Sequence, residues 1–194
     1  MLIFLIKIFL GDDFMIYNKE QIDLYLKKME YNDEIKIDYE TLCKLQIAHL
    51  THIPYENIDV LNRKPISLEA QDLFDKMIVK QRGGYCFELN GLYSNLLKSL
   101  GFNVTNLAGR FIYQDGNTRM RLHRILKIDI DDKSYISDVG VLSELSRKSL
   151  ELEIGKVQND GKCDYKFEYN PKQEGEYILY QRKPKKDWKQ IYSF

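Results

Sequence analysis

One of the three cysteines, Cys86, stands where a glycine-containing loop runs into a helical pattern. Residues 82–90 read Arg-Gly-Gly-Tyr-Cys-Phe-Glu-Leu-Asn, and apolar residues then recur with helical spacing until Gly101. This spacing predicts that Cys86 lies at or near a helix N-terminus, where free N–H groups and the helix dipole favour a thiolate. A thiolate is a nucleophile, so the pattern indicates covalent catalysis. Most cysteines are small buried hydrophobes, and that alternative stays open for Cys86 on the local pattern alone.

A cysteine nucleophile needs a base, and the chain contains three histidines. His49 and His52 belong to a helical run over residues 42–52, in which we expect a packing or capping role. His123 begins an alternating run over residues 122–130, which predicts a strand with His123 on its less apolar face. His123 is therefore the candidate base.

A predicted hairpin brings a carboxylate to His123. Residues 131–133 form a turn, and a second strand then runs into Asp138. If the chain folds back between residues 130 and 131, His123 faces Asp138, and Cβ atoms of facing residues lie about 5 Å apart. A shift of one residue in the turn would leave a diagonal contact. Asp138 could then orient the ring to take a proton from Cys86, although an ordinary surface pair remains the alternative.

These residues resemble the arylamine N-acetyltransferase family. Residues 82–90 match its R-G-G-x-C-x-E-x-N motif, and residues 49–59 resemble its H-x-x-x-I-P-F-E-N-L segment, with Tyr55 in place of phenylalanine. His123 and the run Asp138-Val139-Gly140 resemble the family's catalytic histidine and aspartate segments. Cys86 and His123 are 37 residues apart, and His123 and Asp138 are 15 apart, which is similar to the separations in the family. The resemblance extends from Met15 to about Phe194.

The resemblance implies an acetyl-CoA-dependent N-acetyltransferase with a Cys-His-Asp triad formed by Cys86, His123 and Asp138. Acetyl-CoA acetylates Cys86, CoA leaves, and an arylamine or hydrazine takes the acetyl group from the thioester in a ping-pong reaction. His123 is expected to move protons near the ordinary imidazole pKa of about 6.5. Backbone N–H groups, including that of Cys86, are expected to stabilise the oxyanion.

Other motif residues have expected roles around the triad. Arg82 and Glu56 are expected to pair and to hold the catalytic loop, with Gly83 and Gly84, against the N-terminal helices. Two separate solvent contacts are the alternative for Arg82 and Glu56. Near Cys86, the resemblance and the aromatic side chains suggest an acceptor pocket that includes Tyr85 and Phe87. The family resemblance also implies that the turn at Gly140 lies near the CoA phosphates.

The chain departs from the family's pattern in two places. The family usually continues into a third domain that helps to form the acceptor pocket, whereas this chain ends at Phe194. We therefore expect the third domain to be absent, with weaker selectivity and self-association through exposed surface as consequences. Val141 and Leu142 follow Gly140 where an aromatic residue and a glycine are common. A thiol hydrolase or transglutaminase-like enzyme, and a non-catalytic relative, remain alternative functions.

Composition excludes several classes of protein. The 194 residues include 29 Lys and Arg and 29 Asp and Glu, so the absence of net charge argues against a nucleic-acid or acidic-membrane partner. Three cysteines give no disulfide framework and fit a reducing cytoplasm, and no cluster predicts a metal site. Residues 1–10 are largely apolar but shorter than the roughly 20 residues that span a bilayer. We interpret residues 1–14 as a possible upstream extension, with Met15 as an alternative start.

The chain is predicted to be α+β, with helices first and strands second. Three helices have candidate N-terminal caps: the pair Asn18 and Gln21 for the first, Asp38 for the second and Ser67 for the third. The third helix carries an apolar stripe over residues 70–78. Alternating runs begin near residue 103, separated by turn signals at residues 115–116, 131–132, 159–161 and 170–171. We expect a helical domain over residues 15–102 carrying Cys86. An antiparallel sheet or barrel over residues 103–194 would complete a cysteine-protease-like core.

Overall fold

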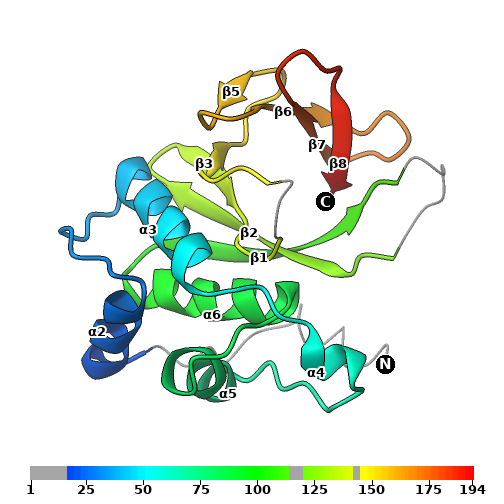
Figure 1. Cartoon of the computed structure of the whole chain (residues 1–194). Helices are drawn as coiled ribbons and strands as arrows, with labels where there is room; N and C mark the ends of the chain where they lie inside the picture. The colour runs from blue at the N-terminus through cyan, green and yellow to red at the C-terminus, as the bar shows by residue number, and fades with distance from the viewer. Residues whose placement is uncertain (1–16, 114–119, 142–144) are drawn as a thin grey trace.

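The computed structural model describes residues 17–113, 120–141 and 145–194. The expected extension over residues 1–14, the alternative start at Met15 and the predicted turn at residues 115–116 lie outside these ranges. Helices occupy the first half of the described chain (Figure 1). They are α2 (Lys19–Lys28), α3 (Tyr39–His52), α4 (Ile58–Leu61), α5 (Ala70–Phe74), the π-helix η1 (Asp75–Val79) and α6 (Cys86–Ser99).

Local signals placed the first two helices correctly. The Asn18 side chain accepts a hydrogen bond from the N–H of Gln21 at 2.9 Å, and the Gln21 side-chain oxygen accepts one from the N–H of Asn18, which completes a capping box before α2. The Asp38 carboxylate accepts from the N–H of Thr41 at 2.8 Å and caps α3. Both predicted caps are confirmed.

The third predicted helix differs from its pattern. Glu69, not Ser67, occupies the N-cap position of α5, and the Ser67 hydroxyl accepts from the N–H of Glu69 at 3.2 Å. After Phe74 the helix widens into η1, in which the N–H of Lys80 donates to the carbonyl of Asp75 at 2.9 Å. The apolar stripe over residues 70–78 therefore spans two kinds of helix, and π-turns of this kind occur often at functional sites.

The second half of the chain forms one antiparallel sheet in the order β4-β3-β2-β1-β8-β7-β6-β5. Beyond β4, Ile154 forms a bridge with Phe167 of β6, so the two sides of the sheet curl toward each other. The predicted α+β architecture, with helices followed by an antiparallel barrel-like sheet, is confirmed. The strands are β1 (Asn103–Phe111), β2 (His123–Ile130), β3 (Lys133–Ser137), β4 (Leu150–Glu151), β5 (Gln158–Asn159), β6 (Asp164–Tyr169), β7 (Tyr177–Arg182) and β8 (Lys189–Ser193).

The predicted register of the β2–β3 hairpin was wrong by two positions. Leu126 pairs with Ser137 and Ile130 pairs with Lys133, so the turn is centred between residues 131 and 132. His123 instead pairs across the sheet with Gly109 of β1, and Asp138 lies just beyond the end of β3. The two side chains therefore meet diagonally and not as a facing pair.

Two apolar cores cover the two faces of the sheet. On one face, Leu126 and Ile128 of β2 pack with Leu92 and other residues of α6, which lies against β1 and β2 (Figure 1). On the other face, Ile125 packs inside the curl of the sheet with Tyr192 and its neighbours. His123 shares this face of β2 with Ile125, Lys127 and Asp129, as the alternating pattern predicts, and its own side chain is fully buried.

Replacement of Leu92, which lies on α6 with no exposed surface, should destabilise the frame that carries Cys86. We expect Leu92→Ala to lower the free energy of unfolding by about 2–5 kcal/mol, because it removes buried methyl groups and leaves a cavity. Leu24 on α2 is 50% exposed and provides the matched control. Urea denaturation should show a change of less than about 1 kcal/mol for Leu24→Ala. Equal losses in both variants would contradict this account of the core.

Candidate active site

Cys86 is the first residue of α6, as its sequence context predicts. Tyr85 precedes the helix in an extended conformation at the N-cap position, and the Cys86 side chain is partly exposed. Its sulfur lies 3.7 Å from the carbonyl oxygen of Leu122, the residue before His123. The first N–H groups of a helix have no acceptor within the helix, so the site combines a thiol with unpaired backbone donors.

His123 and Asp138 form a buried pair. Nε2 of His123 lies 2.5 Å from Oδ2 of Asp138, and the two side chains are 0% and 5% exposed. The other ring nitrogen, Nδ1, makes no hydrogen bond of standard geometry to any described residue, while Cys86 interacts with the ring. The three predicted side chains therefore lie together, with Asp138 bound to Nε2 of the imidazole and Cys86 close enough to interact with the ring.

The surroundings of His123 act on its pKa in opposite directions. Burial lowers the pKa, but the charge of Asp138, its hydrogen bond and the neighbouring Cys86 together outweigh burial and raise the pKa to about 10. This result differs from the expected value near 6.5. The raised pKa favours the protonated ring at neutral pH, with Nε2 donating to Asp138.

Asn90 is a site residue to which sequence reasoning assigned no role. Its amide nitrogen donates to Oδ1 of Asp138 at 2.8 Å and to the carbonyl of Arg124 at 2.6 Å, and its oxygen accepts from the N–H of Val139 at 3.0 Å. Asn90 thus holds the carboxylate that holds His123. The available signal was its place four residues after Cys86, because residues four apart share a helix face.

Two aromatic rings shield the imidazole. The ring of Phe111 lies 4.7 Å from that of His123, and the ring of Tyr192 lies 5.7 Å away, measured between centroids. Both residues belong to the sheet, at the ends of β1 and β8. They exclude water from His123 and so strengthen its interaction with Asp138.

Gly140 brings the turn after β3 against the start of α6. Its N–H donates to Oδ1 of Asp138 at 2.8 Å. A Cβ atom at this position would lie 2.8 Å from Cα of Cys86 and 2.6 Å from Nδ2 of Asn90, closer than non-bonded atoms approach. A glycine is therefore required for this contact between backbone segments.

The loop before Cys86 is held by ionic contacts. The Arg82 guanidinium pairs with the Glu56 carboxylate and also lies 2.9 Å from Oδ2 of Asp59. The other oxygen of Glu56 accepts from the N–H of Gly83 at 2.9 Å. A Cβ at Gly83 would lie 2.2 Å from the carbonyl oxygen of Pro54, so this loop lies directly on the segment that carries Glu56.

A cavity of about 380 Å³ lies beside this loop. Tyr55, which forms a bridge with Gly84, lines it together with Val139 and Val141 on either side of Gly140. Neither Tyr85 nor Phe87 lines the cavity; Phe87 is buried, and the two rings contact each other at 5.7 Å. The remaining lining residues are Leu50, Thr51, Ile53, Leu145, Ser146, Arg147, Asp160, Lys162, Cys163, Tyr165, Gln181 and Lys183.

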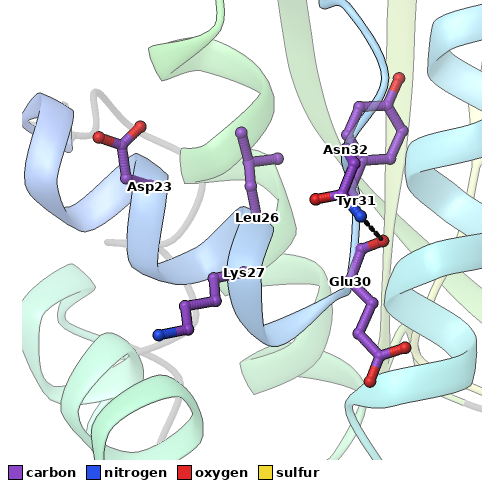
Figure 2. Close-up of a pocket in the computed structure, with 6 residues that line it drawn as sticks. All are labelled: Asp23, Leu26, Lys27, Glu30, Tyr31 and Asn32. Atoms are coloured by element: carbon purple, nitrogen blue, oxygen red, sulfur yellow. Dashed lines mark hydrogen bonds between the residues drawn. The ribbon is translucent and has the colours of Figure 1, made fainter.

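A second hollow, of about 460 Å³, lies along α2, and no residue of the triad lines it. Figure 2 shows its lining residues, which are Asp23, Leu26, Lys27, Glu30, Tyr31 and Asn32.

The other two histidines lie on α3, among the helices. His49 is buried between the rings of Tyr25 and Tyr93, and burial lowers its pKa to about 3. His52 contacts the carbonyl of Ala48 at 2.9 Å.

Within residues 17–113, 120–141 and 145–194, no group of three or more His, Cys, Asp or Glu side chains could hold a metal ion. None of the helices in this same part of the chain is both long and apolar enough to cross a membrane.

The chain is similar to known N-acetyltransferases in sequence. A family model described as N-acetyltransferase matches residues 38–194. An arylamine N-acetyltransferase / N-hydroxyarylamine O-acetyltransferase of Salmonella typhimurium is 36% identical over 80% of this chain. An arylamine N-acetyltransferase of Escherichia coli is 31% identical over 88% of the chain. The aligned parts span 54% and 59% of these two relatives, so the chain corresponds to little more than half of their length.

Solved structures show the same likeness. The arylamine N-acetyltransferase from Salmonella typhimurium superposes with a TM-score of 0.84 at 32% identity, covering 92% of this chain and 64% of that protein. The Mycobacterium marinum arylamine N-acetyltransferase in complex with CoA gives a TM-score of 0.82 at 30% identity, covering 89% and 64%.

The raised pKa of His123 predicts a pH-dependent stability. The folded protein holds the His123 proton more tightly than the unfolded chain, whose imidazole pKa is near 6.5. The stabilisation is therefore complete below that value and is lost as pH rises toward about 10. Asp138→Asn removes the charge that raises the pKa. We expect the difference in unfolding free energy between wild type and Asp138→Asn to shrink from about pH 6.5 to about pH 10 in urea titrations. A difference that grows with pH would contradict the charged pair.

Proposed function

The chain belongs to the arylamine N-acetyltransferase family, and we propose that it transfers the acetyl group of acetyl-CoA to an arylamine or hydrazine through a thioester on Cys86. The observation that carries the proposal is the juxtaposition of Cys86, His123 and Asp138. His123 shares its Nε2 proton with Asp138 at 2.5 Å, and Nδ1 has no other partner of standard geometry among the described residues. That nitrogen is available to exchange a proton with sulfur or substrate.

In the first half-reaction, the Cys86 thiolate attacks the acetyl carbonyl carbon of acetyl-CoA. The bond from that carbon to the CoA sulfur breaks, and the departing CoA thiolate takes a proton from the His123 imidazolium. The products are an acetyl thioester on Cys86, neutral His123 and CoA with a free thiol. Because the pKa of His123 is raised, the ring begins this step protonated and holds the proton that the CoA thiolate takes.

In the second half-reaction, an unprotonated amine attacks the thioester carbonyl. Neutral His123 accepts the proton that the amine loses, and the Cys86 thiolate leaves, which restores the starting ion pair. Negative charge develops on the carbonyl oxygen in both steps. The N–H of Cys86 lies at the first position of α6, where it has no acceptor within the helix and is suited to stabilise this oxygen.

The cavity beside Tyr55 offers space for a substrate of this kind. Apolar side chains from α3 and from the segment after Asp138 form its walls, and three cations, Arg147, Lys162 and Lys183, lie along it. We propose that the apolar walls receive the pantetheine arm of the acyl donor and that the cations attract its phosphates. Gly140, between two lining residues, would place backbone against that arm.

Incubation with acetyl-CoA followed by intact-mass measurement tests the proposal. We expect one acetyl group per chain, mapped to Cys86, and its transfer to added 4-methylaniline with release of the free enzyme. Cys86→Ala should show no acetylation. Cys43→Ala should behave as wild type, because Cys43 is buried and lies on α3 and not on α6. Equal labelling of the Cys86→Ala variant would overturn the assignment.

The fate of the acetyl group separates the alternatives. Release of acetate with no transfer to the amine would favour a thiol hydrolase. Absence of any adduct in the folded wild-type protein would favour a non-catalytic relative.

A further inference from the structure

Lys76 contacts the first turn of α6, helix α4 and the loop before Cys86. Its ammonium lies 2.8 Å from Oε1 of Glu88 and 3.2 Å from Oδ2 of Asp59. Its backbone carbonyl accepts from the N–H of Arg82 at 3.1 Å. The side chain is only 17% exposed, so these contacts are partly shielded from water. Lys76 lies on the π-helix η1 and outside every motif that the sequence suggested.

Glu88, in the first turn of α6, links Lys76 to the residue that precedes Cys86. Its side chain is 3% exposed, and its second oxygen, Oε2, accepts from the N–H of Tyr85 at 3.1 Å. Tyr85 is the N-cap residue and directly precedes Cys86. A Cβ at Gly84 would lie 2.8 Å from Cβ of Glu88 and 2.9 Å from the sulfur of Met77, so η1, the loop and α6 are packed without space to shift.

The charge of Glu88 has a consequence for the thiol. A carboxylate two residues from Cys86 disfavours the thiolate unless a cation neutralises it. Lys76 supplies that cation at 2.8 Å, and its own second partner is Asp59. The helix N-terminus therefore keeps its preference for an anion at Cys86 while Glu88 remains available to fix the Tyr85 N–H.

We propose that Lys76 is a positioning residue for Cys86, acting through Glu88 to fix the first turn of α6 and to cancel the carboxylate charge beside the thiol. The proposal rests on the nucleophilic role proposed for Cys86. It does not require acetyl-CoA as the donor, so the two proposals can fail separately.

Other titratable groups also face the thiol and must stay unchanged in the test. His123 approaches from β2 with Asp138 behind it, and Tyr55 and Tyr85 also interact with Cys86. None of these groups is replaced in the Lys76, Glu88 and Lys64 variants. A change in the pH dependence of Cys86 reactivity then reports on Lys76 and Glu88.

The test follows the rate of Cys86 alkylation by iodoacetamide across pH, with peptide mapping to separate Cys86 from the two buried cysteines. We expect Lys76→Met to move the midpoint of the profile upward by on the order of 0.5–1 pH unit, because the Glu88 charge is no longer cancelled. Lys76→Arg should stay near wild type. The double variant Lys76→Met/Glu88→Gln should return toward wild type, because the amide oxygen still accepts from Tyr85 without a charge.

Lys64 provides the matched control. It also pairs with Asp59, at 3.2 Å, but its side chain is 60% exposed, and within the described part of the chain it forms no ion pair with Glu88. Lys64→Met should therefore leave the alkylation profile unchanged. This control separates the effect of Glu88 from a general loss of positive charge near Asp59.

Two results would overturn the proposal. One is a folded Lys76→Met protein whose profile coincides with those of wild type and Lys64→Met. The other is a double variant displaced as far as Lys76→Met alone. If Lys76→Met fails to fold, Glu88→Gln alone decides the matter: we expect its midpoint at or below the wild-type value, and an upward shift would refute the charge argument.

Discussion

A buried imidazole beside a buried carboxylate is the interaction on which the site depends. Water cannot solvate either His123 or Asp138, so each must be satisfied by the other and by neighbouring polar groups. Both Asp138 oxygens are used: Oδ2 faces His123, and Oδ1 accepts from Asn90 and from the N–H of Gly140. Removal of His123 would leave the buried Asp138 charge without its cationic partner, and the two remaining donors come from α6 and from the turn after β3, so helix, strand and turn must meet at one point.

The loop before Cys86 is likewise held by paired charges, which are more exposed to solvent than His123 and Asp138. Glu56, Asp59 and Glu88 supply three carboxylates, and Arg82 and Lys76 bridge them. A surface ion pair contributes little to stability, but several partly shielded pairs with backbone donors fix geometry. Here the carboxylates also accept from the N–H groups of loop residues, so the network restrains the backbone as well as the side chains.

Features of the fold that depend on local sequence could be predicted, and those that depend on tertiary packing could not. The caps at Asn18 and Asp38 involve residues three apart, and the order of helices and strands follows from periodicity. The hairpin register was missed because it depends on turn conformation: Asp131 adopts a left-handed φ of 52°, which allows a two-residue turn centred one residue later than predicted. The widening at η1 leaves the apolar stripe intact, so periodicity gave no sign of it.

The site residues show the same division. The sequence placed Cys86 at a helix start because Gly101 and the apolar spacing define that helix locally. It could not reveal that Asn90, one turn further along α6, reaches across to Asp138, since that contact requires the sheet to be in place. α6 therefore carries both the proposed nucleophile and the amide that orients the carboxylate at the opposite end of the triad. A rotation of this one helix would displace both ends together, and the close approach of Gly140 to Cys86 and Asn90 opposes that rotation from the side of the sheet.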